Sequence, residues 1–371
     1  MQTVNDPSTT TPSTADPSAL DRLAGGTTAG VGESRGGGPS SNRTAPQTMR
    51  AVTQVRYGEA DVLGIERIGR PTPASDEVLI RVRAAGLDRG VWHLMAGLPY
   101  VVRLAGYGLR RPKQPVPGAD VAGVVEAVGA GVTTFAPGDE VLGIGSGTFA
   151  EYAVAPAAKL VRRPASVSWP AAGALAMSGI TAYQAVVEHA GVGPGERVLV
   201  IGASGGVGSY AVQIAKSLGA HVTGVASTAK LDRVRILGAD DVVDYTTTEI
   251  TDGPDRFDVI IDTGGNRRLR VLRRALERYG RLVIVGGEAG GRFIGGTDRQ
   301  LRAMVWSRFV SQDLKSFISP ENADDIQAVV DLVVAGDVTP AIDRVFSLED
   351  VVEAMSHVVA GRALGKVVIR P

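Results

Sequence analysis

The chain has 371 residues, of which 44% are hydrophobic and 21% charged, and its formal net charge is zero. This composition is typical of a soluble globular protein with room for more than one domain. It has no excess of positive charge that would indicate binding to nucleic acid or to an anionic membrane. The absence of cysteine excludes disulfides and thiolate metal sites. No apolar run reaches the ~18 residues of a membrane span, so we expect a cytoplasmic protein with neither nucleic acid nor a membrane as partner.

Residues 1–48 are rich in Ser, Thr, Gly, Pro and Ala and have no hydrophobic periodicity. Segments such as GGTTAG and RGGGPSSN are typical of flexible linkers. The segment lacks the basic start and apolar centre of a secretion signal. We therefore predict a disordered tail over residues 1–48.

Short strand-like segments punctuated by glycine and proline follow the tail. Residues 77–85 alternate, with Val78, Ile80 and Val82 on one face and Arg81 on the other, as in a half-buried antiparallel strand. Many short strands of this kind predict a β-rich, barrel-like domain of about 120 residues. The other expected strands are residues 49–55, 121–128, 140–142, 149–154 and 159–161.

From about residue 170 apolar runs alternate with helical patterns, which predicts a parallel, doubly wound sheet. The first helix is expected over residues 171–190, with a break around Ser178 and Gly179. Strands are then expected at residues 198–201, 221–225, 241–244, 257–261 and 281–285, with helices at 209–218, 230–237 and 267–278.

The C-terminal part also carries clear boundary signals. Ser319-Pro320 predicts the start of a helix that runs to residue 335. Ser347 and Asp350 have the spacing of a capping box. They precede a helix whose expected apolar face consists of Val351, Val352, Met355, Val358 and Val359, and residues 366–369 form a last strand.

The chain is organised around residues 198–216, VLVIGASGGVGSYAVQIAK. An apolar strand is followed by Gly202, Gly205 and Gly208 and then by a helix. Glycines at this spacing let the backbone turn tightly and approach phosphates, and the helix N-terminus offers free N–H groups. This order predicts a pyrophosphate-binding turn; the alternative is an ordinary tight connection between a strand and a helix.

The chain as a whole resembles the medium-chain dehydrogenase/reductase superfamily. The resemblance lies in the combination of PVPGADVAGVVEAVGAGV, FAPGDEVLG, GASGGVGSYAVQIAK, LGADDVVDY and GRALGKVVI. It implies an α/β fold with a GroES-like β-rich partial barrel and a Rossmann doubly wound parallel sheet. The expected domains are a GroES-like catalytic domain at 49–178, completed by 314–371, and a Rossmann domain at 179–313.

Zinc alcohol dehydrogenases of this superfamily carry a catalytic cysteine and a Gly-His-Glu motif. Here Asp88 stands at the cysteine position, and Ala119-Asp120 replaces His-Glu after Gly118. A zinc site would lack its thiolate and imidazole ligands, so activation of an alcohol by a Lewis acid is not expected. The sequence instead resembles the zinc-free quinone oxidoreductases, a branch that also includes enoyl reductases, and we expect no metal site.

The residues after the second Rossmann strand indicate which dinucleotide binds. NAD enzymes carry a carboxylate there for the ribose diol, whereas this chain offers Ser227 and Lys230 and no carboxylate before Asp232. A lysine attracts a 2′-phosphate, which favours NADPH over NADH. The alternative for Lys230 is a solvated residue of the first helical turn. The resemblance implies that Tyr245 lies beside the adenosine phosphate and Thr181 near the nicotinamide. The expected cofactor-binding residues are therefore Thr181, Gly202, Ser204, Gly205, Gly206, Val207, Gly208, Ser227, Lys230, Tyr245 and Gly264.

Hydride transfer to a quinone or an α,β-unsaturated carbonyl needs neither a metal nor a covalent intermediate. The loop over residues 87–100 is expected at the cleft between the domains and supplies the catalytic candidates Asp88, His93 and Tyr100. His93 or Tyr100 is a candidate acid for the reduced product; the alternative is that the loop only lines the pocket.

Other functions compatible with the same motifs are an NAD(P)-dependent alcohol dehydrogenase or aldehyde reductase, and a low-turnover NADPH-binding sensor. The expected partner is a small carbonyl or quinone substrate. The resemblance also implies a homodimer, with Phe293-Ile294 and residues 301–309 as the expected contact region.

Overall fold

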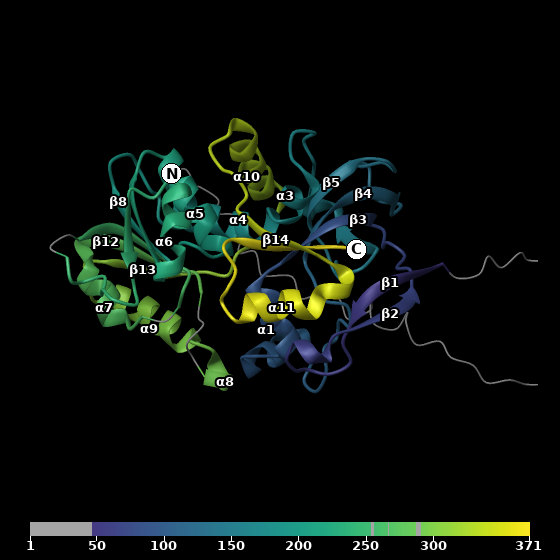
Figure 1. Ribbon diagram of the computed structural model, residues 1–371, viewed down its shortest axis with the longest axis horizontal. Coiled ribbons are helices and arrows are strands. Elements are labelled where there is room, and N and C mark those ends of the chain that lie inside the picture. The colour runs from purple at the N-terminus through teal and green to yellow at the C-terminus, as the bar shows by residue number, and fades with distance from the viewer. Residues whose placement is uncertain (1–46, 254–255, 266, 287–290) are drawn as a thin grey trace, which may run out of the picture. The chain divides into compact units, whose positions relative to one another are not determined.

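The computed structural model describes residues 47–253, 256–265, 267–286 and 291–371. The predicted tail lies outside these residues except for its last two, since β1 (Thr48–Thr53) already includes Thr48. Figure 1 shows the two main sheets, one around β3 and β4 and the other around β8 and β12. No helix in the described part of the chain is long and apolar enough to cross a membrane.

The first large sheet has the strand order β14-β15-β3-β4-β5-β7, with β6 also paired to β3. β3 (Glu77–Leu87) buries its apolar residues and exposes Arg81 and Arg83, as the alternation predicted. The C-terminal β15 (Lys366–Arg370) pairs antiparallel with β3 and parallel with β14 (Ile342–Ser347). The other strands are β4 (Asp120–Val128), β5 (Glu140–Ile144), β6 (Tyr152–Pro156) and β7 (Leu160–Arg162).

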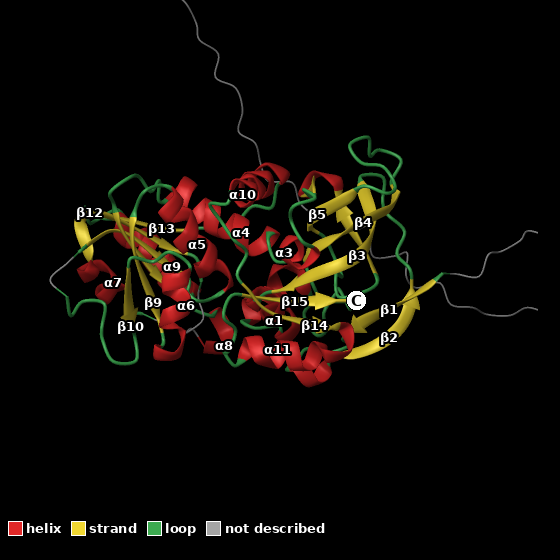
Figure 2. Ribbon diagram, turned by 45° about the horizontal axis from the view of Figure 1, so that its top comes forward, coloured by secondary structure: helices red, strands yellow, loops and turns green. Residues whose placement is uncertain are grey.

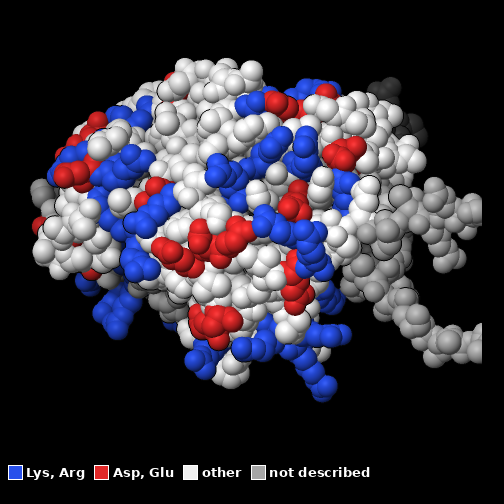
Figure 3. Space-filling view, turned by 45° about the vertical axis from the view of Figure 1, so that its right-hand side comes forward, with Lys and Arg blue, Asp and Glu red and all other residues white. Residues whose placement is uncertain are grey.

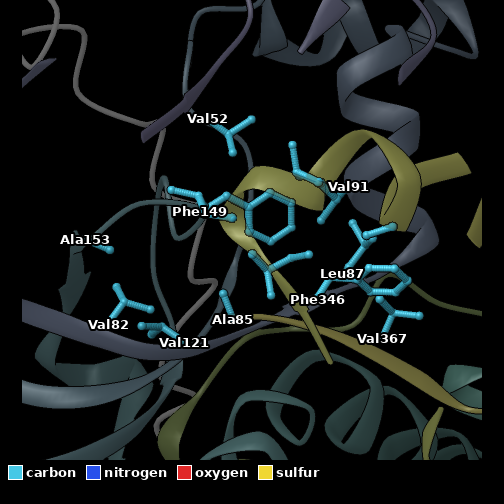
Figure 4. Packing of buried hydrophobic residues seen from close by; sticks show 14 of the residues in the cluster. Val52, Val82, Ala85, Leu87, Val91, Val121, Phe149, Ala153, Phe346 and Val367 are labelled. Atoms are coloured by element: carbon cyan, nitrogen blue, oxygen red, sulfur yellow. The ribbon is translucent and has the colours of Figure 1, made fainter. Parts of the chain in front are cut away.

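A buried apolar cluster joins this sheet to the segments around it. Figure 4 shows Phe149 close to Val52, Val91 and Phe346, side chains that come from four separate parts of the chain. Phe149 is completely buried. The cluster ties the C-terminal segment to the N-terminal strands because the apolar surface of both is removed from water together.

The second sheet has the strand order β10-β9-β8-β11-β12-β13, and each neighbouring pair is parallel. This is the order of a Rossmann fold. It continues through β13 (Asp313–Ser316), past the boundary expected at residue 313. The remaining strands are β8 (Arg197–Ile201), β9 (His221–Ala226), β10 (Asp241–Asp244), β11 (Phe257–Asp262) and β12 (Leu276–Ile284), and the helices are α5 (Gly206–Ser217), α6 (Leu231–Ile236), α7 (Leu269–Ala275), α8 (Gly291–Ile294) and α9 (Thr297–Ser307).

The helix break predicted at Ser178 and Gly179 was misplaced. The break lies between α3 (Trp169–Gly173) and α4 (Ala176–Tyr183), and α4 continues through Gly179 into a π-helical turn at Gln184–His189. A Cβ atom at Gly179 would lie 2.8 Å from Val329 Cγ1 of α10 (Ala323–Ala335). The glycine therefore permits close helix packing and does not interrupt the helix.

Other boundaries also differ from the expected ones. α10 begins after Asn322, whose side chain accepts from Asp325 N, and not at Ser319-Pro320. α7 ends at Ala275 rather than at residue 278, because the chain enters β12 at once and Leu276 is buried beside Phe257. In α11 (Val351–Val359), Val352 is exposed and does not belong to the buried face.

The side chains of Ser347 and Asp350 form a hydrogen bond of 2.6 Å with each other at a short 3₁₀ turn (Leu348–Asp350) before α11. Neither side chain accepts a hydrogen bond from a backbone N–H of the turn or the helix, so the predicted capping box does not form.

The remaining elements flank these two sheets (Figure 2). β1 pairs antiparallel with β2 (Gly64–Gly69). α1 (Arg89–Ala96) follows β3, and α2 (Tyr100–Val102) leads into a π-helical turn at Arg103–Tyr107. Figure 3 shows basic and acidic side chains interspersed over the face that it presents, in keeping with the zero net charge.

Candidate functional site

A cleft of about 850 Å³ opens at the carboxyl ends of β8, β9 and β11, where residues of both sheets meet. β8 and β11 are neighbours although two strands separate them in the sequence, so the connections leave this point in opposite directions. Ligands of doubly wound sheets bind at such a point. One wall of the cleft comes from α1 and α4, and the other from the Rossmann strands and the turns after them.

The glycine turn forms the middle of the cleft. Gly202 has φ 79°, a left-handed conformation that favours glycine. α5 begins at Gly206, three residues earlier than expected, and no side chain caps its N-terminus. Gly208 does not line the cleft; a Cβ atom there would lie 2.1 Å from Gly202 O. Gly208 therefore allows the helix to pack on the turn. The free N–H groups of the first helical turn indicate a binding site for an anion.

Ser227, Lys230 and Tyr245, the residues expected on the adenosine side, all line the cleft. Lys230 Nζ donates to Gly361 O at 2.6 Å and to Ala363 O at 2.8 Å. Burial lowers the pKa of Lys230. Lys230 is thus a half-buried link between the Rossmann sheet and the C-terminal segment, and the alternative of a merely solvated lysine is wrong.

Two carboxylates near these residues were not anticipated from the sequence. Asp244 at the end of β10 accepts hydrogen bonds from Thr228 and Thr246, and it does not line the cleft. Glu249 does line the cleft and accepts from Arg267 Nε at 2.8 Å. Asp244 is the last residue of β10 and Glu249 follows in the loop after it, and the parallel pairing of β10 with β9 brings them to the second strand's end.

Asp88, His93, Thr181 and Gly264 also line the cleft, and Asp88 and Gly264 lie beside the glycine turn. Thr181 Oγ1 donates to Met177 O at 2.7 Å. His93 Nδ1 lies 3.0 Å from Leu98 O, and because a carbonyl only accepts, Nδ1 carries the hydrogen and donates it. Burial lowers the pKa of His93, which favours the neutral ring with an unprotonated Nε2.

Tyr100 does not line this cleft. Its ring packs edge-on against Phe293, with 5.4 Å between the ring centroids, and the Arg103 guanidinium lies 4.7 Å from its centroid. The structure therefore brings Asp88 and His93 together in the cleft but leaves Tyr100 outside the residues that line it.

A buried ion cluster underlies the cleft at Asp88. Lys366 Nζ contacts Asp88 Oδ1 and lies 3.0 Å from Asp120 Oδ2. Ser178 Oγ donates to Asp88 Oδ1 at 2.7 Å, and Met177 N donates to Asp120 Oδ1 at 2.7 Å. We call Asp88, Asp120, Ser178 and Lys366 the buried cluster. Strand register brings it together: Val367 pairs with Leu87, so their neighbours Lys366 and Asp88 also meet.

The members of the buried cluster differ in their protonation. Burial raises the pKa of Asp120 to about 7, with the Asp88 carboxylate adding to the effect, although Lys366 acts in the opposite sense. Burial also disfavours ionised Asp88, but Lys366 and the hydrogen bonds to Asp88 outweigh this and hold its pKa below the ordinary value. For Lys366 burial is outweighed by the two carboxylates, which raise its pKa. Lys366 therefore stays charged and Asp120 titrates near neutral pH.

Sequence reasoning missed the role of Asp120, Ser178 and Lys366. A weak signal was present: Asp120 and Lys366 each stand at the start of an apolar strand, where a charge that becomes buried needs a partner. The residues of the cleft fit a dinucleotide, because an uncapped helix N-terminus, Lys230, Asp88 and His93 all belong to the same cleft. The described residues contain no group of three or more His, Cys, Asp or Glu side chains that would hold a metal.

Comparison with known proteins matches both halves of the chain. Residues 74–165 match the family described as alcohol dehydrogenase GroES-like domain, and residues 237–369 match the zinc-binding dehydrogenase family. The chain is 31% identical to chloroplastic quinone-oxidoreductase QR1 of Triphysaria versicolor, over 88% of this chain and 100% of that protein. It is 32% identical to the 2-methylene-furan-3-one reductase of Solanum lycopersicum, over 90% of this chain and 81% of that protein.

Among solved structures, a mycobacterial protein in complex with NADPH is 25% identical, with a TM-score of 0.75, over 87% of this chain and 100% of that one.

Proposed function

Because the chain belongs to the medium-chain dehydrogenase/reductase superfamily and is an oxidoreductase that binds a pyridine nucleotide, we propose that it is an NADPH-dependent reductase that transfers a hydride to a quinone or an α,β-unsaturated carbonyl without zinc. The observation that carries the proposal is the cleft itself, which Lys230, the glycine turn and Asp88 line together. The names of the quinone-oxidoreductase and furanone reductase relatives support this substrate class.

NADPH is favoured over NADH by the charges near Ser227. Lys230 has two of its N–H groups on backbone carbonyls, which leaves the third for a phosphate oxygen. The nearby Asp244 carboxylate is engaged by Thr228 and Thr246 and does not line the cleft. A 2′-phosphate would therefore meet a hydroxyl and an ammonium, while Glu249, a carboxylate that also lines the cleft, is paired with Arg267. The NADPH complex of the mycobacterial relative is consistent with this choice.

The chemistry assigned to the cofactor is delivery of a hydride to an acceptor that is already electrophilic. The protein must position the acceptor, exclude water and supply one proton. Asp88 and Ala119 stand at the ligand positions of zinc enzymes, and neither offers a thiolate or an imidazole. Catalysis without zinc is thus the proposal that the side chains favour.

Asp88 is the proposed acid, and His93 is proposed to accept a hydrogen bond from the O–H group of the reduced, protonated product. His93 has an unprotonated Nε2 when its ring is neutral, so this atom accepts and does not donate. Tyr100 stays a sequence-based candidate; it would need the loop over residues 98–107 to move before its hydroxyl reached the cleft.

We further propose that the enzyme is a cytoplasmic homodimer that pairs through the Rossmann sheet. β13 stands at an end of the strand order and pairs on its outer side with no other strand of the described residues, although Leu314 N donates to Ser307 Oγ of α9. α9 packs beside β13. Exposed apolar side chains of α9 and the residue shortly after it are Leu301, Met304, Val305, Trp306 and Phe309.

The decisive experiment is a panel of quinones, enones, aldehydes and secondary alcohols, each tested with NADPH and NADH and with and without a chelator. We expect reduction of quinones or enones with NADPH, unchanged by the chelator. Chelator-sensitive oxidation of alcohols would instead identify a metal-dependent alcohol dehydrogenase. Tight NADPH binding without turnover of any acceptor would identify a sensor.

The cofactor proposal is tested by Lys230→Ala, with Lys216→Ala as the matched control, since Lys216 pairs with Asp240 and does not line the cleft. Loss of a charge-assisted hydrogen bond of about 1.5–3 kcal/mol weakens NADPH binding roughly tenfold or more. NADH binding should change little in either variant. Equal weakening of NADH and NADPH by Lys230→Ala would show that this lysine does not read the 2′-phosphate.

A further inference from the structure

The buried cluster has an inner and an outer half. Asp88 and Ser178 line the cleft, whereas Asp120 and Lys366 lie beneath them and are each 1% exposed. The four side chains come from the start of α1, from β4, from α4 and from β15. The cluster therefore connects the cleft with a group that solvent does not reach directly.

The charges of the cluster do not balance when both carboxylates are ionised. Two negative charges then face the single positive charge of Lys366, and one buried negative charge is left without a partner. Such a charge is costly in a protein interior, and one added proton removes the cost. Protonation of Asp120 near neutral pH is the expected response.

Among the described residues, no other group packed around the cluster replaces this proton. Tyr210 of α5 is fully buried, donates to Ala174 O at 3.0 Å, and has a pKa well above the ordinary value because of burial and the nearby carboxylates. His93 and Arg89 face the cleft from α1 on the outer side. The titrating unit around pH 7 is therefore the carboxyl pair Asp88–Asp120, which shares one proton.

The cluster also lies directly below the first turn of α5. A Cβ atom added at Gly206 would be 3.1 Å from Ser178 Oγ and 3.3 Å from Lys366 Cδ. The same atom would be 3.7 Å from Asp88 Oδ1. An anion held by the N–H groups of this turn would thus add negative charge beside the carboxyl pair and favour its protonated form.

We propose that the buried cluster is a proton store that is filled when the dinucleotide binds and emptied, through Asp88, onto the reduced acceptor. This inference deepens the proposed function and rests on it. Asp88 is the catalytic residue of the store, because it lines the cleft; Asp120 and Lys366 are positioning residues that act through it.

The proton balance of the reaction fits one stored proton. Reduction of an enone or a quinone requires one hydride and one proton, and the hydride is the cofactor's contribution. The Asp120 proton passes to Asp88, whose O–H bond then breaks; the electron pair stays on the carboxylate and the new bond forms on the reduced acceptor. The cluster is left with one net negative charge and takes up a proton from solvent when the next reduced dinucleotide binds.

Calorimetry of dinucleotide binding without an acceptor tests the filling step. Titrations of the full chain near pH 7.5, in buffers with different ionisation enthalpies, give the number of protons taken up per dinucleotide bound. We expect uptake of between about half and one proton for the natural protein, because binding raises a carboxyl pKa that starts near the assay pH. NADH should give the same uptake as NADPH, since both carry the pyrophosphate.

Comparison of the two dinucleotides separates the cluster from the 2′-phosphate, which itself titrates near pH 6. Uptake with NADPH but none with NADH would assign the proton to that phosphate and overturn the proposal. Asp120→Asn should bind both dinucleotides with uptake close to zero, while Asp120→Glu should restore it. Asp324→Asn, a matched change of an exposed carboxylate on α10, should behave as the natural protein.

Infrared spectroscopy of the free enzyme tests for the stored proton without dinucleotide binding. The free enzyme at about pH 6 should show the C=O stretch of a protonated carboxyl that is lost in Asp120→Asn and retained in Asp324→Asn. Identical spectra or identical proton uptake in Asp120→Asn and the natural protein would refute the store. Failure to bind either dinucleotide would refute the proposed function instead, so the two failures are distinguishable.

The emptying step is read from kinetics. Asp88→Asn should lower kcat about a hundredfold or more, as expected for loss of a positioned acid, with little change in dinucleotide affinity. Asp120→Asn should flatten the pH profile of kcat around neutral pH while KM for the acceptor stays similar. An unchanged pH profile in Asp120→Asn would show that Asp120 is only a structural group.

Discussion

Replacing Asp120 by asparagine should change how the stability of the protein depends on pH. Asp120 is 1% exposed and its pKa is raised from the ordinary 3.8 to about 7, with burial as the main cause. Because the folded value lies above the unfolded one, the native state keeps a proton that the unfolded state releases. The stability from this proton is complete below about pH 4 and is lost as the pH rises toward 7.

The size of the effect follows from the pKa difference. One proton held by the native state alone gives a slope of about −1.4 kcal/mol per pH unit in the free energy of unfolding. The slope falls off as the pH reaches the folded pKa, so between about pH 5 and pH 7 the natural protein should lose about 2 kcal/mol that Asp120→Asn does not lose. Asp88 has a lowered pKa and Lys366 a raised one, so both titrate outside this window.

Urea unfolding followed by tryptophan fluorescence at about pH 5, 6, 7 and 8 measures the difference. Contributions of the histidines are common to both proteins and cancel in the comparison. We expect the stability of Asp120→Asn relative to the natural protein to rise steadily from pH 5 to 7 and then to level off, while Asp324→Asn shows no trend. A difference that is constant across this range would refute the assignment of the proton to Asp120.

Three further substitutions test other parts of the fold. Gly208→Ala places a Cβ atom 2.1 Å from Gly202 O. Dinucleotide affinity, measured by fluorescence titration, should therefore fall strongly. The control Gly238→Ala, just after the end of α6, should leave the affinity unchanged. Arg299→Ala removes the ion-pair partner that lies 2.7 Å from the fully buried Asp262 carboxylate. This change should lower the free energy of unfolding by about 3 kcal/mol. A loss of equal size in Arg302→Ala would contradict this, because Arg302 forms its ion pair at the surface. Gly179→Ala places a Cβ atom 2.8 Å from Val329 Cγ1 and should destabilise the protein by about 1–3 kcal/mol. The double variant Gly179→Ala/Val329→Ala should be less destabilised than the sum of the two single variants. Additive losses of stability would argue against the contact.

The sequence predicted the strand, glycine turn and helix and the alternation of strands and helices because these depend on local pattern. Gly202, Gly205 and Gly208 follow an apolar strand at regular spacing, and the contact that requires glycine at Gly208 is with Gly202 O, only six positions away. The alternation in β3 likewise follows from residues two positions apart. The error at Gly179 had the opposite origin, since the contact that requires glycine comes from Val329, far along the chain.

The chemistry of the cleft was only partly predictable for the same reason. The sequence supplied Asp88, His93 and Lys230 as candidates and excluded thiolate ligands, since composition and spacing are local facts. Lys366 meets Asp120 across 246 positions and Asp88 across 278 positions. Pairing of β15 with β3 decides those contacts, and burial of the three charges together decides their protonation. Only the tertiary structure could therefore show that one carboxyl next to the cleft holds a proton near neutral pH.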